Sequence, residues 1–174
     1  MEIEIGKGKT ARRAYGFDEI AIVPSRRTRD PEDIDISVNL SGFHLKIPIL
    51  ASAMDGVVDV KVAVEMYRIG GLGVLNLEGI QTRYDNADEM LEKIASFKDD
   101  EATRKMQEIY KEPIKEELIV KRIKQIKSEG AVAIASLTPQ KVEKYYKTAL
   151  SAGLDILVIQ GTVISAEHVS SSRE

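Results

Sequence analysis

Four short apolar segments constrain the fold of this chain more than any other feature of its sequence. Each ends in small or polar residues, and the segments cover residues 47–54, 71–76, 131–136 and 154–162. Strands that are apolar along their whole length are typical of a parallel sheet buried on both faces, and their alternation with helices indicates βαβ units. The sequence therefore predicts an α/β fold, with helices on one face of the sheet and either a barrel interior or a second helical layer on the other.

The stretches between these strands have helical periodicity. Helices are expected over residues 60–69, 86–97, 101–110 and 116–129, and a fifth opens at Pro139, a residue favoured in the first turn of a helix. Gly70 ends the first helix. The glycines of residues 70–73 lack the spacing of a dinucleotide-binding loop, and close packing of a helix on a strand explains them better. The charged residues of the helices are interpreted as solvated faces.

Two regions depart from this alternation. Residues 78–115 are heavily charged and separate the second strand from the third more widely than a simple crossover needs, so they predict a helical insertion on one face of the domain. Residues 1–45 are interpreted as an N-terminal arm and hairpin, with a loose arm over 1–13 and short strands over 17–23 and 33–38. All 174 residues are expected to belong to a single domain.

Composition excludes several classes of function. The formal net charge of −3 gives no broad positive field for nucleic acid, and no apolar run approaches the roughly 20 residues of a transmembrane helix. The sequence has no cysteine, which excludes a disulfide framework, a thiolate metal site and a cysteine nucleophile within these residues. We expect a cytoplasmic protein that binds neither nucleic acid nor membranes and has no metal ligands in this chain.

Small or polar residues lie at the end of each predicted strand, where parallel α/β proteins have their catalytic and binding residues. They are Ser52, Met54 and Asp55 after the first strand, Asn76 after the second, Ser136 after the third, and Gln160, Gly161 and Thr162 after the fourth. Hydroxyl, amide and glycine groups suit the binding of a sugar or nucleotide by hydrogen bonds. For any one Ser, Thr or Asn alone, the N-cap of the following helix is the simpler interpretation. The sequence contains no Walker, HExxH, CxxC or GxSxG motif.

In their order and in their residues, these segments resemble those of the IMP dehydrogenase/GMP reductase family. Residues 15–24 resemble the opening of IMP dehydrogenases, and residues 48–57 are similar to that family's Pro-Leu-Val-Ser-Ser-Pro-Met-Asp-Thr-Val. Residues 70–76 are similar to its Gly-Gly-Ile-Gly-x-Ile-His, and residues 153–162 to its Gly-Val-Asp-x-Val-Val-Leu-Asp-Ser-Ser. The resemblance implies a TIM (β/α)₈ barrel, of which this chain holds about the first four β/α units plus an N-terminal β-hairpin extension. Residues 78–115 are too short and too helical for the CBS module that IMP dehydrogenases carry there. In this respect the chain resembles the IMP dehydrogenase-related branch that lacks the module.

The resemblance also implies roles for the strand ends. Ser52 and Met54 fall where the family contacts the purine nucleotide. Residues 160–162 fall where it meets the nicotinamide end of NAD, and Asn76 is assigned to the same cofactor. Asn76, Gln160 and Gly161 replace the family's His, Asp and Ser, so the cofactor contacts of this chain depart from the family pattern.

The family reaction oxidises IMP to XMP with NAD through attack of a cysteine thiolate on purine C2, hydride transfer and hydrolysis. Its cysteine loop and phosphate-binding loops belong to later strands, so no catalytic residue is expected in this chain. The implied partners are a purine nucleotide (IMP, XMP or GMP), NAD or NADP as cofactor, a potassium ion bound by the later strands, and further copies in a homotetramer.

Three hypotheses follow from the sequence. The first is the N-terminal half of an IMP dehydrogenase-like oxidoreductase of guanine nucleotide biosynthesis, inactive by itself because it lacks the cysteine loop. The second is a GMP reductase, which converts GMP to IMP with NADPH. The third is a non-enzymatic half-barrel that pairs with a partner chain or a second copy. The sequence stops at the beginning of a predicted helix, which favours truncation over a natural half-barrel.

Overall fold

The computed structural model describes residues 2–24, 26–40 and 42–161, except the side chains of 99 and 100, and the chain divides into two compact units, Met1–Asp35 and Ile36–Glu174. The predicted end of the N-terminal arm, residue 45, falls inside the second unit. The first unit contains an antiparallel hairpin of β1 (Glu2–Gly6) and β2 (Lys9–Arg12), followed by the 3-10 helices η1 (Phe17–Glu19) and η2 (Pro31–Asp33).

The sequence predictions for this first unit were wrong in two places. Residues 1–13 are not a loose arm, because β1 and β2 pair through a turn in which Gly8 has a positive φ of 69°. Residues 17–23 form no strand, because Glu19 closes a tight turn: its backbone N–H donates to the Gly16 carbonyl and its carboxylate accepts from the Gly16 N–H. Ile20 and Ile22, which follow this turn, are exposed.

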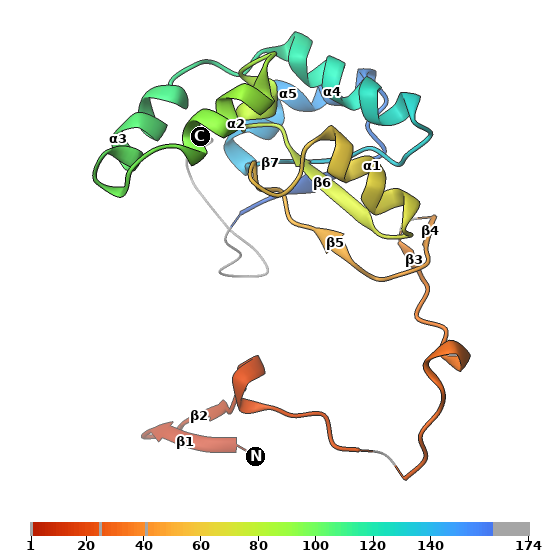
Figure 1. Ribbon diagram of the computed structural model, residues 1–174. Coiled ribbons are helices and arrows are strands. Elements are labelled where there is room, and N and C mark those ends of the chain that lie inside the picture. Colours follow the sequence, from red (N-terminus) through yellow and green to blue (C-terminus); the bar gives the residue numbers. More distant parts are fainter. Residues whose placement is uncertain (1, 25, 41, 162–174) are drawn as a thin grey trace. The chain divides into compact units, whose positions relative to one another are not determined.

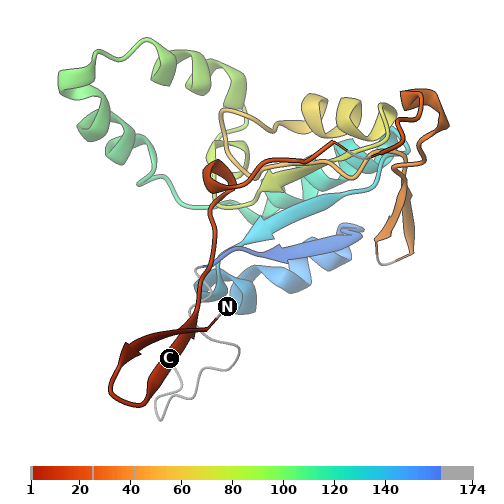
Figure 2. The same ribbon diagram turned by 90° about the horizontal axis from the view of Figure 1, so that it is seen from below.

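The second unit is built around a four-stranded parallel sheet. A hairpin of β3 (Val38–Leu40) and β4 (Phe43–Leu45) leads into β5 (Leu50–Ala51), β6 (Leu72–Asn76), β7 (Ile134–Leu137) and β8 (Ile156–Ile159), which lie side by side in chain order. The strand predicted over 33–38 begins only at its last residue. Helices α1 (Val60–Arg68), α4 (Glu116–Ser128) and α5 (Pro139–Ser151) connect successive strands and cover one face of the sheet (Figures 1 and 2). This arrangement is that of the first strands of a (β/α)₈ barrel, which confirms the predicted fold class.

Hydrophobic side chains fill both faces of the sheet, as a parallel sheet requires. Leu75, Ala135 and Leu137 point toward the helices and join a cluster with Ile119 and Ile123 of α4. The alternate positions on the same strands, together with a residue of β4, form a second cluster on the opposite face, made of Leu45, Leu72, Val74 and Ile134. The face on which a residue lies therefore follows its odd or even position along the strand.

The insertion between β6 and α4 contains η3 (Ile80–Thr82), α2 (Ala87–Ala95) and α3 (Asp99–Ile109), so both helices predicted in this region are present. Its small separate core consists of Ile80, Ala87 and Ile109, with partly buried apolar neighbours from α2 and the adjoining loops. Across the described part of the chain, no helix combines the length and the apolar character needed to cross a membrane.

Candidate functional site

Strand register brings the predicted polar residues to one rim. Asn76 at the end of β6 pairs directly with Ser136 of β7, and Ser136 pairs with Val158 of β8. The Gln160 N–H donates to the Leu137 carbonyl at 2.8 Å, which extends the ladder past the end of β8. Because side chains alternate along strands, Asn76, Ser136 and Gln160 belong to the face opposite the helices.

These residues line a cavity of about 490 Å³ at the carboxyl ends of the strands. Its lining consists of two side-chain amides, two hydroxyls, one carboxylate and two small residues: Asn76, Gln160, Ser136, Thr138, Glu78, Ala53 and Gly161. None of these lining residues is a lysine, arginine or histidine. Such a donor and acceptor set suits sugar hydroxyls, amides or the edges of bases better than it suits a phosphate.

Glu78 makes the cavity still less suitable for a phosphate. Its carboxylate accepts a 2.5 Å hydrogen bond from the N–H of Thr138, the N-cap residue of α5, whose own side chain makes no capping hydrogen bond. The positive end of the α5 dipole is therefore already matched by a negative charge. Among the described residues, no group of three or more His, Cys, Asp and Glu side chains is placed to hold a metal ion.

Asn76 has a different role from the N-cap that its position in the sequence suggests. Its Nδ2 donates to Asp55 Oδ1 at 3.2 Å, and its Oδ1 accepts from the Glu78 N–H at 3.0 Å. The amide therefore joins the loop after β5 to the loop after β6. The N-cap of α1 is Asp59, whose Oδ1 accepts from the Val62 N–H at 2.7 Å.

Gly161 stands where the resembling family has a serine, and its neighbours give a reason. A Cβ at this position would lie 3.2 Å from Cγ and 3.4 Å from Cδ of Pro139, the first residue of α5. A serine here would therefore crowd the first turn of α5, whereas glycine fits.

The predicted purine contacts lie beside the cavity and do not line it. Ser52 and Met54 are exposed and flank Ala53, the lining residue from this loop. The loop is held as a turn, because the Met54 N–H donates to the Ser52 carbonyl and the Met54 carbonyl accepts from the N–H groups of Val57 and Val58. The structure thus brings Asn76, Gln160 and Gly161 together, while Thr162 lies outside the described residues.

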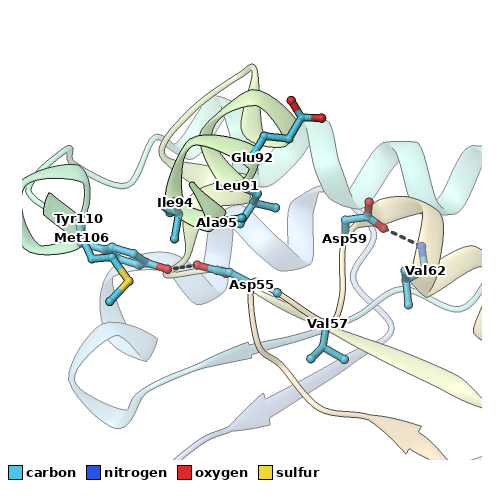
Figure 3. A pocket seen from close by; sticks show the side chains of 11 residues that line it. Asp55, Val57, Asp59, Val62, Leu91, Glu92, Ile94, Ala95, Met106 and Tyr110 are labelled. Carbon is cyan, nitrogen blue, oxygen red and sulfur yellow. Dashed lines mark hydrogen bonds between the residues drawn. The ribbon is translucent and has the colours of Figure 1, made fainter. Parts of the chain in front are cut away.

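The sequence analysis named Asp55 among the strand-end residues but predicted none of its contacts, although three hydrogen bonds converge on its carboxylate. Besides Asn76, it accepts from the backbone N–H of Ile80 at 2.9 Å and from the hydroxyl of Tyr110 (Figure 3). Partial burial raises the pKa of Tyr110, and the hydrogen bond to the Asp55 carboxylate raises that pKa further. No local signal connects Asp55 with Tyr110, because their contact is tertiary.

Asp55 and Tyr110 also line a second, more apolar cavity of about 670 Å³. This cavity lies between the loop after β5, the start of α1 and helices α2 and α3, and Val57, Leu91 and Met106 contribute to its walls (Figure 3). Asp55 therefore stands between the polar rim cavity and the insertion.

Comparison with known proteins gives consistent results. The family model described as the IMP dehydrogenase / GMP reductase domain matches residues 14–172. An uncharacterized oxidoreductase of Mycolicibacterium smegmatis is 37% identical over 99% of this chain and 47% of that protein. An inosine-5'-monophosphate dehydrogenase of Methanocaldococcus jannaschii is 42% identical, over 38% of this chain and 13% of that protein.

Solved structures agree with the sequence relatives. The crystal structure of an IMP dehydrogenase/GMP reductase-like protein from Corynebacterium glutamicum superposes with a TM-score of 0.86 at 37% identity, over 97% of this chain and 46% of that one. The chain spans about half the length of the curated oxidoreductases that it matches over nearly all of its residues. On the match to the family model and on this fold, the chain belongs to the IMP dehydrogenase / GMP reductase domain family.

Proposed function

We propose that this chain supplies the first half of the barrel of an IMP dehydrogenase-like oxidoreductase, which oxidises IMP to XMP with NAD. The observation that carries the proposal is the rim cavity, into which β6, β7 and β8 contribute Asn76, Ser136 and Gln160. In parallel α/β barrels, substrate and cofactor bind at this end of the strands.

The residues at the rim fit the nicotinamide end of the cofactor. Asn76 and Gln160 would bind ribose hydroxyls and the carboxamide by hydrogen bonds, and Gly161 would allow the ring to approach the backbone. NAD, when bound, supplies the hydride acceptor. Ser52 and Met54, on the adjacent loop, would contact the purine nucleotide.

The chain's own contribution is to bind and orient these molecules. The sequence contains no cysteine, so the thiolate that the family reaction needs does not come from these residues. We accordingly expect the 174-residue chain by itself to be inactive, and the intact enzyme to be a cytoplasmic homotetramer.

The test uses the purified protein expressed from its native gene, with that gene's own start and stop codons. With IMP and NAD⁺ we expect NADH absorbance to rise and XMP to appear on chromatography. Gln160→Ala should raise the KM for NAD⁺ about tenfold, the effect of one lost hydrogen bond to the cofactor. Gln107→Ala, the same change at an exposed position of α3, should leave the KM unaltered. No NADH from IMP, or equal KM values in the two variants, would contradict the proposal.

GMP reductase is the alternative, because the matching family model covers both activities. The same preparation tests it with GMP and NADPH, by loss of NADPH absorbance and release of ammonia. If the native product catalyses neither reaction, that result would favour the third hypothesis, a half-barrel that pairs with another chain.

A further inference from the structure

One carboxylate connects the insertion to the rim cavity. Asp55 Oδ1 accepts from Asn76 Nδ2 at 3.2 Å, and Asp55 Oδ2 accepts from the Ile80 N–H at 2.9 Å. Asp55 Oδ2 also accepts from the Tyr110 hydroxyl (Figure 3). Asn76 lines the rim cavity, and Tyr110 is the C-cap of α3 in the insertion. The carboxylate therefore receives one donor from the rim cavity, one from η3 at the start of the insertion and one from the end of α3.

Close packing fixes the place of this carboxylate. A Cβ on Gly79 would lie 1.7 Å from Asp55 Oδ1, so the carboxylate occupies the space that a side chain at position 79 would need. The orientation of the Asn76 amide is also fixed, because its nitrogen points to Asp55 and its oxygen accepts from the Glu78 N–H. If this amide were flipped, its oxygen would face the Asp55 carboxylate and its NH₂ group would face the Glu78 N–H, so both hydrogen bonds would be lost.

Tyr110 is held against the same loop by a second set of contacts. The Arg83 guanidinium lies 5.6 Å from the centre of the Tyr110 ring and donates to the Tyr110 carbonyl at 3.0 Å. The same side chain donates from Nε to the Glu78 carbonyl at 2.9 Å. The end of α3 and the loop after β6 therefore form one connected unit around Asp55.

We propose that Asp55 is a positioning residue of the nucleotide site, which orients Asn76 in the rim cavity, and that Tyr110 of the insertion holds Asp55 in place. This inference rests on the proposed function, since it assumes that the rim cavity binds a nucleotide. It assigns the insertion a part in binding: helices outside the barrel determine how an amide inside the site is presented.

The test compares Asp55→Asn and Tyr110→Phe with Tyr84→Phe in the native gene product. Tyr84 is a matched control, because its hydroxyl donates to the Ile109 carbonyl within the same insertion and not to Asp55. The first readout is hydrogen–deuterium exchange of the Glu78 and Ile80 amides without nucleotide. The second is the Kd for IMP and for NAD⁺ by calorimetry.

Asp55→Asn and Tyr110→Phe should speed exchange of both amides and weaken binding of at least one of the two molecules, each about tenfold, as loss of a hydrogen bond to a charged group predicts. Tyr84→Phe should leave both readouts unchanged, even where it lowers the melting temperature. Unchanged exchange in Asp55→Asn and Tyr110→Phe would refute the connection whatever happens to binding. Faster exchange with unaltered affinity would refute the positioning role and leave the proposed function standing. A wild-type protein that binds neither molecule would remove the proposed function, and the positioning role with it.

Discussion

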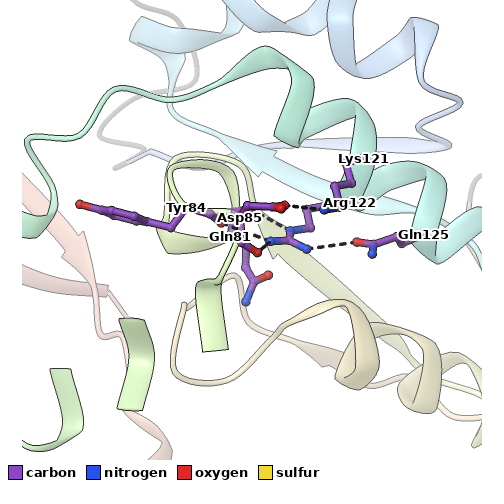
Figure 4. Close-up of polar contacts among 6 residues, drawn as sticks. All are labelled: Gln81, Tyr84, Asp85, Lys121, Arg122 and Gln125. Atoms are coloured by element: carbon purple, nitrogen blue, oxygen red, sulfur yellow. Dashed lines mark hydrogen bonds and ion pairs between the residues drawn. The ribbon is translucent and has the colours of Figure 1, made fainter. Parts of the chain in front are cut away.

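Arg122 of α4 gives a direct test of how the insertion is attached to the barrel. Only 8% of this residue is exposed, although it lies on a helix rich in charged residues. Its Nε donates to the Gln81 carbonyl at 3.0 Å, and its Nη2 donates to the carbonyls of Tyr84 and Asp85 at 3.2 and 2.7 Å (Figure 4). Its Nη1 donates to Gln125 Oε1 at 3.3 Å. One guanidinium thus holds η3 and the turn that follows it.

Arg122→Met keeps much of the aliphatic stem and removes these hydrogen bonds. Gln81 is buried, so its carbonyl loses a partner that water does not readily replace, which costs about 1–3 kcal/mol. The bonds to the Tyr84 and Asp85 carbonyls are only partly buried, and water replaces part of each, so we assign about 0.5 kcal/mol to each. The expected loss is about 2–4 kcal/mol of unfolding free energy, a large share of the roughly 5–15 kcal/mol of a typical domain.

Urea unfolding followed by circular dichroism measures this loss, provided that the slope of the transition does not change. Lys124→Met is the control, since it removes an exposed cation from the same helix and should change stability by less than about 0.5 kcal/mol. Arg122→Lys should fall between the two, because an ammonium group cannot span carbonyls that a planar guanidinium reaches together. Equal stability of Arg122→Met and Lys124→Met would show that the guanidinium does not hold the insertion.

Three further predictions use the same preparation. A Cβ at Gly73 would lie 2.8 Å from the Ala63 Cα, so Gly73→Ala should lower the unfolding free energy by about 1–3 kcal/mol. Gly56→Ala, with nothing within 4 Å, should change it by less than about 0.5 kcal/mol, and similar losses in both would contradict close packing of α1 on β6. The pKa of Tyr110 is raised in the folded state, so its stabilising contribution is complete below pH 10 and declines above it. The wild type should therefore lose unfolding free energy relative to Tyr110→Phe as the pH rises above 10, by at most about 1.4 kcal/mol per pH unit and by less because the ring is partly exposed; parallel profiles would contradict this. β8 is an edge strand among the described residues and 60% of Ile159 is exposed, so the 174-residue chain alone should self-associate; light scattering from a stable monomer at all concentrations would disprove it.

The parallel sheet and its helices could be predicted because their signals are local. Each strand is a short apolar run, each helix has apolar residues at helical spacing, and Gly70 follows α1 with a positive φ of 98°. Strand limits were less accurate. β7 begins at Ile134 and not at Ala131, because the N–H of Ala133 donates to the side chain of Asp155 instead of joining a regular ladder.

The candidate site was predictable only in part, for a physical reason. Strand ends in a parallel sheet meet at one rim, so Asn76 and Gln160 could be grouped from the sequence alone. The partners of Asp55 could not, since Tyr110 reaches it from another helix. Arg122 also has the same local pattern as the exposed lysines around it, and only the carbonyls of another segment explain its burial.

The attachment of the insertion depends mainly on backbone acceptors, and this bears on which parts of its sequence can change. Arg122 holds its first turn, and Arg83 holds its end, through carbonyl groups that every residue type provides. Side chains on the outer faces of α2 and α3 can therefore vary without loss of either anchor. The Tyr110 hydroxyl is different, because it is the side chain through which the insertion reaches Asp55 and, by way of Asp55, the amide of Asn76. Substitutions across the insertion should accordingly affect stability in proportion to burial, whereas an effect on nucleotide binding should be concentrated at Tyr110.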